Sequence, residues 1–485
     1  MINRNSQGSV EKRDRWLLKG LLSLNLVLMV LLITTGCIMT KKGDVTEYKN
    51  LNLKGFKQEV LENGLTVIWI PDVKLPRVSL QLMVQAGSVY ESPEERGFHA
   101  LTASLFGEST LRYTALELNQ KLEQFGFEFG AASDTDYSLL SISGLSPYRF
   151  EMLDLFVHIL LESKFDVKDF ERKKQNTLTH FKRALDDPST VASLAIGQTL
   201  YGNHPYGGLV SGTPKTVTDM KVEDCLRIYK VFYQPHRARL VVSGRWNEKD
   251  LDEIRRAFVK WRSFDTHLVK KPQAVAGGVQ QKQIWVFHKP KLEQTQIRFA
   301  HLSVPQNHPD FLKMRVANIT LGGAFASRLL QVIRDDLGLT YSVHSSTTGY
   351  LVGGHFQIST FTRHEKVREL VEHVHRLFKE FVEGGITEKE LRAAQSVLIG
   401  QFPGTIETPD QLGNALLTMW IRGMPEDYLS TFQSRVASFN LEEINQVIKK
   451  YFYPDQLSTV IYTDFDQVKD QLKALNVTTY KTFNW

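Results

Sequence analysis

The sequence predicts an α+β protein made of two homologous halves, each an antiparallel-rich sheet covered by helices. The 485-residue chain is 42% hydrophobic and 23% charged, which is the composition of an ordinary folded protein. Strand-like segments and long helical segments are mixed without a strict βαβ alternation, and this favours antiparallel sheets. Similar segments recur about 220 residues apart, which indicates a duplication.

Charge and cysteine content exclude two classes of function. The formal net charge of +6 is small for this length, and no basic run is interleaved with aromatic residues, so we expect no nucleic-acid partner. The two cysteines, Cys37 and Cys225, form no CxxC pair. A structural thiolate zinc site is therefore excluded.

Residues 1–36 are predicted to be a signal peptide. Several basic residues precede the apolar run Leu21–Ile33, which is too short to favour a spanning helix. Cys37 follows Gly36 as in the bacterial lipobox, where the thiol is lipidated, although Thr34 stands where that motif usually has Leu, Val or Ile. The alternative is an uncleaved anchor helix with an incidental cysteine. Both interpretations export the chain and tie it to a membrane, and the polar segment 37–55 is predicted to be the tether.

The two halves are predicted to span residues 56–268 and 283–485, with a linker at 269–282. Each half opens with two strands, then carries a long helix, and closes with a Tyr-x-Pro-type stop before an apolar strand. The matching segments are Gly64–Pro71 with Gln283–Phe287, Val78–Val84 with Gln296–Ala300, Lys168–Gln175 with Glu388–Gln395, and Arg239–Gly244 with Ser458–Thr463.

Two further segments carry the candidate chemistry. A helix is expected from Gly97 through Gly107, with His99 in its first turn. In the second half, Phe325, Leu329 and Ile333 predict one apolar helix face. Gly338 is placed to end that helix, and a strand is expected from Thr340.

Residues 56–485 resemble the insulinase/pitrilysin family of metallopeptidases, which includes the mitochondrial processing peptidases. The resemblance rests on the order and spacing of several short motifs. These are Val84-Gln85-Ala86-Gly87-Ser88, Glu91 and Gly97 before His99, then His204-Pro205-Tyr206-Gly207, Gly212-Thr213 and the stretch 321–343. It implies a clamshell of two halves around a peptide chamber.

Active members of that family carry H-x-x-E-H on the first-half helix, where two histidines bind zinc and the glutamate activates water. The matching positions here are His99, Thr102 and Ala103. The family's third ligand, a glutamate, falls at His180. Ala103 has no ligand atom and a threonine is a poor general base, so we expect no metal cofactor in this chain. Simple structural roles are expected instead, with His99 capping or packing on its helix and His180 half-exposed.

The family's second-half signature is retained. An arginine and a tyrosine seven residues apart face the zinc from that half, and they correspond to Arg334 and Tyr341. A fixed guanidinium and a phenol can hold substrate carbonyls and stabilise a developing oxyanion. The alternative is a solvated helix face for Arg334, beside Asp335 and Asp336, and a strand core position for Tyr341.

The resemblance implies the inactive subunit of a two-chain peptidase. Its partner would carry an intact H-x-x-E-H and the zinc, and its substrate would be a peptide or an unfolded segment. The chain itself would be a lipoprotein on the periplasmic side of the inner or outer membrane, and it would support proteolysis only with that partner. Two other hypotheses stay open: a peptidase-derived scaffold lipoprotein with no role in proteolysis, and an atypical metallopeptidase using His99 and His180.

Overall fold

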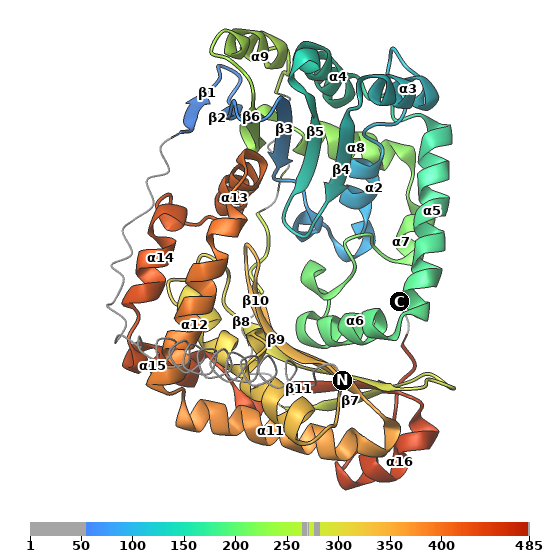
Figure 1. Ribbon diagram of the computed structural model, residues 1–485. Coiled ribbons are helices and arrows are strands. Elements are labelled where there is room, and N and C mark those ends of the chain that lie inside the picture. The colour runs from blue at the N-terminus through green and yellow to red at the C-terminus, as the bar shows by residue number, and fades with distance from the viewer. Residues whose placement is uncertain (1–54, 264–268, 270, 276–281, 484–485) are drawn as a thin grey trace, which may run out of the picture. The chain divides into compact units, whose positions relative to one another are not determined.

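The computed structural model describes residues 55–263, 269, 271–275 and 282–483. The first half contains a six-stranded sheet in the order β1-β2-β6-β3-β5-β4 (Figure 1). Only the β2–β6 pair is parallel. Its strands are β1 (Lys57–Val60), β2 (Thr66–Pro71), β3 (Arg77–Val84), β4 (Glu128–Ser133), β5 (Ser138–Leu145) and β6 (Ala238–Gly244).

The second half repeats this topology with five strands in the order β7-β11-β8-β10-β9, and again one pair, β7–β11, is parallel. Strand by strand, β2, β6, β3, β5 and β4 correspond to β7, β11, β8, β10 and β9. The predicted duplication and the antiparallel-rich sheets are confirmed. The strands are β7 (Ile284–His288), β8 (Thr295–Ser303), β9 (Val343–Gly349), β10 (Gly354–Thr362) and β11 (Ser458–Thr463).

Helices cover both sheets. Those of the first half are α2 (Phe98–Ser104), α3 (Ala115–Phe125), α4 (Arg149–Glu162), α5 (Val167–Asp186), α6 (Pro188–Tyr201), α7 (Pro214–Asp219), α8 (Val222–Phe232) and α9 (Asp250–Phe258). Those of the second half are α10 (Phe311–Asn318), α11 (Val367–Gly384), α12 (Glu388–Gln401), α13 (Pro409–Ile421), α14 (Tyr428–Ser438), α15 (Leu441–Tyr451) and α16 (Phe465–Ala474). The predicted helical segments Lys168–Gln175 and Glu388–Gln395 lie within α5 and α12, whereas the helix expected from Gly97 through Gly107 is shorter, because α2 ends at Ser104.

Two helices cross between the halves. Helix α6, from the first half, packs its apolar side chains on the second sheet, against Ala300 and Val460. Helix α13, from the second half, places Leu417 and Ile421 on the first sheet, against Val241. Each sheet is thus completed by the other half of the chain, and both belong to one compact unit, Asn50–Trp485.

Polar contacts fix both crossings. Arg298 of β8, which is buried, donates from Nη2 to the carbonyl oxygen (3.0 Å) and the hydroxyl (2.7 Å) of Ser189 at the start of α6. Asp410 at the start of α13 accepts a hydrogen bond from Ser243 Oγ of β6 (2.6 Å). Because Arg298 is buried and a buried charge is stable only when partnered, its bonds to Ser189 set where α6 docks. The bond from Ser243 to the half-buried Asp410 ties α13 to β6.

A third contact between the halves is an ionic network around Asp136, a fully buried residue in the β4–β5 turn. Its carboxylate accepts hydrogen bonds from Tyr206 Oη (2.7 Å) and from the backbone N–H of Leu351 in the β9–β10 turn (3.0 Å). It also forms an ion pair with Arg422, which follows α13. First-half and second-half residues therefore meet at one buried carboxylate.

The predicted signal peptide at 1–36, Cys37 and nearly all of the tether at 37–55 lie outside the described residues. Half of the predicted linker at 269–282, residues 270 and 276–281, does so as well, and the half boundaries stay a prediction. Among the residues that the structure describes, no helix combines the length and the apolar character needed to cross a bilayer.

Candidate functional site

The first-half helix α2 begins at a buried turn that holds His99 by its backbone. Gly97 has φ +93°, and a Cβ there would lie 2.4 Å from the carbonyl oxygen of Ser211, so only glycine fits. The Glu91 carboxylate accepts hydrogen bonds from the N–H of Gly97 (3.0 Å) and of His99 (2.8 Å). Glu91 therefore caps the helix, and burial raises its pKa to about 8.

The His99 side chain is packed in a hydrophobic environment. It is 1% exposed, and its ring meets the ring of Phe232 edge-on with centroids 4.4 Å apart. Its Nδ1 has no hydrogen-bond partner within the described residues. Burial, helped by the positive charges of Arg237 and Arg227, lowers the pKa of His99 to about 3. The imidazole is neutral near pH 7 and serves as a packing residue.

The other zinc-motif positions offer no ligand set. Thr102 and Ala103 are fully buried, and Thr102 Oγ1 donates to the carbonyl oxygen of Phe98 (2.7 Å). His180 lies on α5 as an exposed residue, more open than the half-exposed position we expected. The residues present do not fit a zinc ion with three protein ligands and a water.

A guanidinium stands beside these positions. Arg237, just before β6, lies over the rings of Tyr90 (5.4 Å) and Phe232 (5.3 Å). Its Nη2 donates to the carbonyl oxygen of Gln85 (2.6 Å). Since Phe232 also packs on His99, a fixed positive charge borders the histidine and opposes the approach of a cation. The sequence motif alone did not single out Arg237.

One group among the described residues has metal-compatible spacing, and it lies elsewhere. It consists of His288, Asp464 and Asp466. The structure explains this group without a metal, because Asp464 caps α16 and His288 Nδ1 accepts the N–H of Phe465 (3.0 Å).

The second-half segment is organised differently. Arg334 lies on a π-helical stretch, Leu330–Asp336. Gly338, two residues after its end, has φ +59° and turns the chain out of the helix. The predicted stop at Gly338 is confirmed, and its N–H donates to the carbonyl oxygen of Arg334 (3.2 Å). The expected strand start at Thr340 is wrong, because β9 begins at Val343.

The predicted apolar face is correct for Leu329 and Ile333, which are fully buried, and wrong for Phe325, which is 76% exposed. Phe325 lies in a turn before the helix, where the N–H of Ser327 bonds back to Ala324. Its ring instead lies against Arg334, with the guanidinium 4.6 Å from the ring centroid. Because Phe325 has helical spacing to Leu329 and Ile333, the sequence alone did not indicate that it is exposed.

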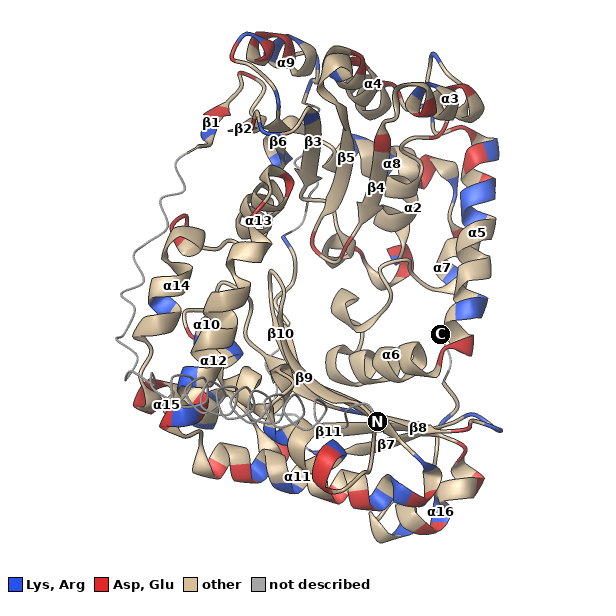
Figure 2. Cartoon of the chain, in the orientation of Figure 1, with Lys and Arg blue, Asp and Glu red and all other residues tan. Residues whose placement is uncertain are grey.

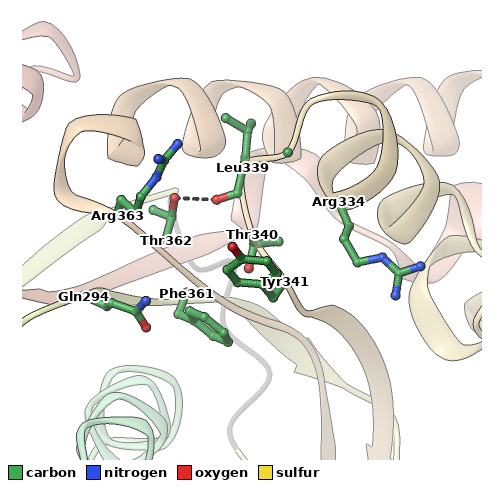
Figure 3. Close-up of a pocket in the computed structure, with 9 residues that line it drawn as sticks. Gln294, Arg334, Leu339, Thr340, Tyr341, Phe361, Thr362 and Arg363 are labelled. Carbon is green, nitrogen blue, oxygen red and sulfur yellow. Dashed lines mark hydrogen bonds between the residues drawn. The ribbon is translucent and has the colours of Figure 1, made fainter.

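Arg334 and Tyr341 both line an open pocket of about 290 Å³ (Figure 3). Tyr341 is 86% exposed, so the strand core alternative does not describe it. Arg334 is partly exposed, and its Nε pairs with Asp335 (2.8 Å). Figure 3 shows the Tyr341 ring in the middle of the pocket and the guanidinium of Arg334 extending away from it. The remaining lining residues are Gln294, Gly338, Leu339, Thr340, Phe361, Thr362 and Arg363.

The wall behind Tyr341 is fixed to the core. Leu339 is buried, and its carbonyl oxygen accepts a hydrogen bond from Thr362 Oγ1 of β10 (2.6 Å). Thr340 Oγ1 and Thr360 Oγ1 both donate to the carbonyl oxygen of Ser342 (3.0 and 2.9 Å). An exposed phenol on a pinned backbone is suited to contact a bound chain with little loss of entropy.

Comparison with known proteins agrees with this arrangement. Residues 66–213 match the family model described as Insulinase (Peptidase family M16), and residues 219–398 match the model described as Peptidase M16 inactive domain. The chain belongs to the insulinase family, M16.

Curated relatives within this family carry contrasting names. The "Uncharacterized zinc protease YmxG" of Bacillus subtilis is 23% identical, covering 84% of this chain and 98% of that protein. The "Non-peptidase homolog YmxG" of Helicobacter pylori is 24% identical over 84% of this chain and 94% of its own length. Bovine mitochondrial-processing peptidase subunit beta is 21% identical over 87% of this chain and 86% of its own length.

Solved structures show the same fold. A peptidase M16 inactive domain from Pseudomonas fluorescens superposes with a TM-score of 0.77 at 24% identity, covering 85% of this chain and 98% of that one. A Helicobacter pylori protease gives 0.78 at 18% identity, covering 86% and 100%. With its zinc motif replaced at Thr102 and Ala103, this M16 homologue is of the inactive kind, consistent with a non-catalytic role.

Proposed function

We propose that this chain is the non-catalytic, substrate-binding subunit of a heterodimeric zinc metallopeptidase acting on peptides or unfolded segments. It would enclose half of a peptide chamber and present Arg334 and Tyr341 to a substrate held at the partner's zinc. The proposal includes export and membrane anchoring through Cys37.

One contrast carries this proposal. The zinc-motif positions on α2 are sealed in the core, whereas Arg334 and Tyr341 line an open pocket. Since an exposed tyrosine on a pinned backbone adds little to the stability of the fold, a binding role accounts better for the second-half arrangement.

The zinc-motif positions support the need for a second chain. Ala103 has no ligand atom, and the Thr102 hydroxyl is buried and donates to the carbonyl oxygen of Phe98. A catalytic metal would therefore have to come from outside this chain. The name of the bovine relative describes one subunit of a processing peptidase, which fits this division of labour.

A reconstitution experiment tests the proposal. The full chain would be mixed with a zinc-bearing M16 protein from the same source that has an intact H-x-x-E-H, and cleavage of quenched fluorescent unfolded peptides would be measured. We expect a gain over the partner alone. Arg334→Ala should lower kcat/KM by 10-fold or more, because loss of one transition-state donor typically costs about 10²–10³-fold.

The control is Arg368→Ala on α11, an arginine that is also surface-exposed and also paired with a neighbouring carboxylate (Glu372, 2.7 Å). It should leave the rate unchanged. No gain from mixing, or equal effects of Arg334→Ala and Arg368→Ala, would reject the proposal. Stable binding to a non-peptidase partner, with an affinity that substitution of Arg334 or Tyr341 does not change, would favour the scaffold alternative.

A further inference from the structure

Exposed apolar side chains gather on two connections at one end of the first sheet. Val73 and Leu75, in the β2–β3 connection, are 69% and 67% exposed, and Leu145, Tyr148 and Phe150, where β5 passes into α4, are 41–52% exposed. Single exposed apolar residues are ordinary on a protein surface, whereas a group of them marks an interaction site. We name these five residues the apolar tip.

The two connections of the apolar tip are directly joined. The N–H of Ser146 donates to the carbonyl oxygen of Pro76 (2.9 Å), and Arg77 is paired with Leu145 across the β3–β5 ladder. Arg245 adds a side-chain hydrogen bond to the carbonyl oxygen of Val73. The exposed residues therefore lie on one continuous rim of the sheet.

Local packing holds the aromatic members at the surface. The Tyr148 ring packs on Phe125 with centroids 5.3 Å apart, and the Arg149 guanidinium lies 4.4 Å from the Phe150 ring centroid. Arg149 is itself anchored by Asp250, whose carboxylate accepts from Nε (2.8 Å). Rings that are pre-positioned in this way lose little freedom when they bind.

The chain enters the first sheet at this same end. Lys57, the first residue of β1, is paired with Trp69, two residues before β2 ends at Pro71, and Val73 follows. Residues 38–56 separate the predicted lipid-bearing Cys37 from this point. As the polar tether that the sequence predicts, this segment would span roughly 25 Å on average. A lipid on Cys37 would thus keep the apolar tip close to the bilayer.

Charges at this end are mixed. Figure 2 shows both signs on α9, α4 and α3, so this end of the sheet is not a uniformly basic patch for anionic lipids. Lys74 stands between the two exposed side chains of the β2–β3 connection, and a lysine can place its stem among apolar groups with its charge at the interface. Contact with lipid would therefore depend mainly on apolar side chains.

We infer that the apolar tip docks on the surface of the bilayer that holds the N-terminal lipid. The inference rests on the proposed anchoring and adds an orientation to it. The tether raises the local concentration of bilayer around the tip, so a few inserted side chains suffice. The first sheet would then stand with its β2–β3 and β5–α4 connections against the lipid headgroups.

Depth-dependent fluorescence quenching tests this orientation in the full lipidated chain. A bimane label would be placed by Leu75→Cys or Phe150→Cys, and the protein reconstituted into phosphatidylethanolamine–phosphatidylglycerol vesicles containing nitroxide-labelled lipid. The native Cys225 is buried, and burial raises its pKa to about 12, so it should stay unlabelled. The matched control is Leu116→Cys on α3, at a leucine that is 68% exposed and not part of the apolar tip.

We expect at least twofold stronger quenching at Leu75 and Phe150 than at Leu116, and its loss from the Phe150 reporter in the Val73→Ser/Leu75→Ser background. Equal quenching at all three positions, or quenching only after the peptidase partner is added, would overturn the inference. Retention of the chain on vesicles separates this from the anchoring proposal. If the chain is retained on vesicles but labels in the apolar tip are not quenched, the orientation alone is overturned. If a Cys37→Ser chain is not retained on vesicles but its labelled tip is quenched at high lipid concentration, the contact between the apolar tip and lipid is supported independently of the anchor.

Discussion

The α2 segment of the first half and the Arg334–Tyr341 segment of the second half are the two places where the sequence resembles the functional motifs of the insulinase family. In the first, His99, Thr102 and Ala103 are buried and surrounded by apolar contacts. In the second, Tyr341 is exposed and Arg334 borders an open pocket. One segment is part of the core, and the other is open to solvent.

The two segments of one fold therefore differ in how they are surrounded. Phe232 packs against the His99 ring, and Arg237 lies over Phe232. The Tyr341 side chain is open to solvent. The comparison predicts opposite responses to substitution in the two segments.

The largest effect should come from rebuilding the lost motif. Thr102→Glu with Ala103→His places a carboxylate and a ring where no space exists, since both positions are fully buried. We expect the free energy of unfolding to fall by about 3–5 kcal/mol, as for an uncompensated buried charge, with no zinc bound near stoichiometry. Denaturant unfolding and metal analysis check this. A stable variant that takes up one zinc would break the comparison.

A second effect concerns acid stability. The folded-state pKa of His99 is lowered to about 3, while the unfolded chain protonates near 6.5. The unfolded state therefore gains a proton first as pH falls, and stability contributed by neutral His99 is lost between about pH 6.5 and 3. His99→Leu should reduce the fall in the free energy of unfolding between pH 6.5 and 3 by up to a few kcal/mol. The control is His180→Leu, at an exposed histidine, which should leave that fall unchanged.

A smaller effect is expected at Phe325. Its ring lies against the Arg334 guanidinium, and an exposed cation–π contact is worth about 0.5–1 kcal/mol. Phe325→Ala should weaken binding of an unfolded peptide by about 3–5-fold and leave the thermal midpoint in place. Fluorescence anisotropy of a labelled unfolded peptide, measured with this chain and its proposed partner, gives the affinity. Unchanged affinity would remove Phe325 from the binding surface.

The smallest change should be in the stability of Tyr341→Ala. Because the side chain is 86% exposed, the free energy of unfolding should change by no more than about 0.5 kcal/mol. A loss of 2 kcal/mol or more in denaturant unfolding would show that Tyr341 supports the fold and would erase the contrast with α2.

Local patterns in the sequence predicted the duplication and the strands β2, β3, β6, β7, β8 and β11. The degenerate zinc positions came from the resemblance to the insulinase family. Alternating apolar residues and proline stops report burial along one segment, and these segments were placed within a few residues of their observed bounds. The same logic failed at Phe325. Its spacing to Leu329 and Ile333 fits one helix face, but the backbone turns at Ala324–Ser327 before the helix starts.

Other features depend on contacts between distant segments, which no local pattern encodes. Apolar side chains are spread around most of helix α6, so its own residues do not indicate which sheet it covers. Likewise Asp136, Tyr206 and Arg422 are far apart in sequence and meet only in the folded chain. Arg237 takes its place beside His99 for the same reason.

The crossing of α6 and α13 also has a consequence for how this chain is made. A polypeptide cut between the halves, at a site within 276–281, would yield two fragments that each lack a helix required by their sheet. Neither fragment could bury the apolar face of its own sheet, so the two would have to associate in order to fold. Both halves must therefore be synthesised before either sheet is complete. We therefore expect residues 55–483 to unfold as one cooperative unit despite the duplicated architecture.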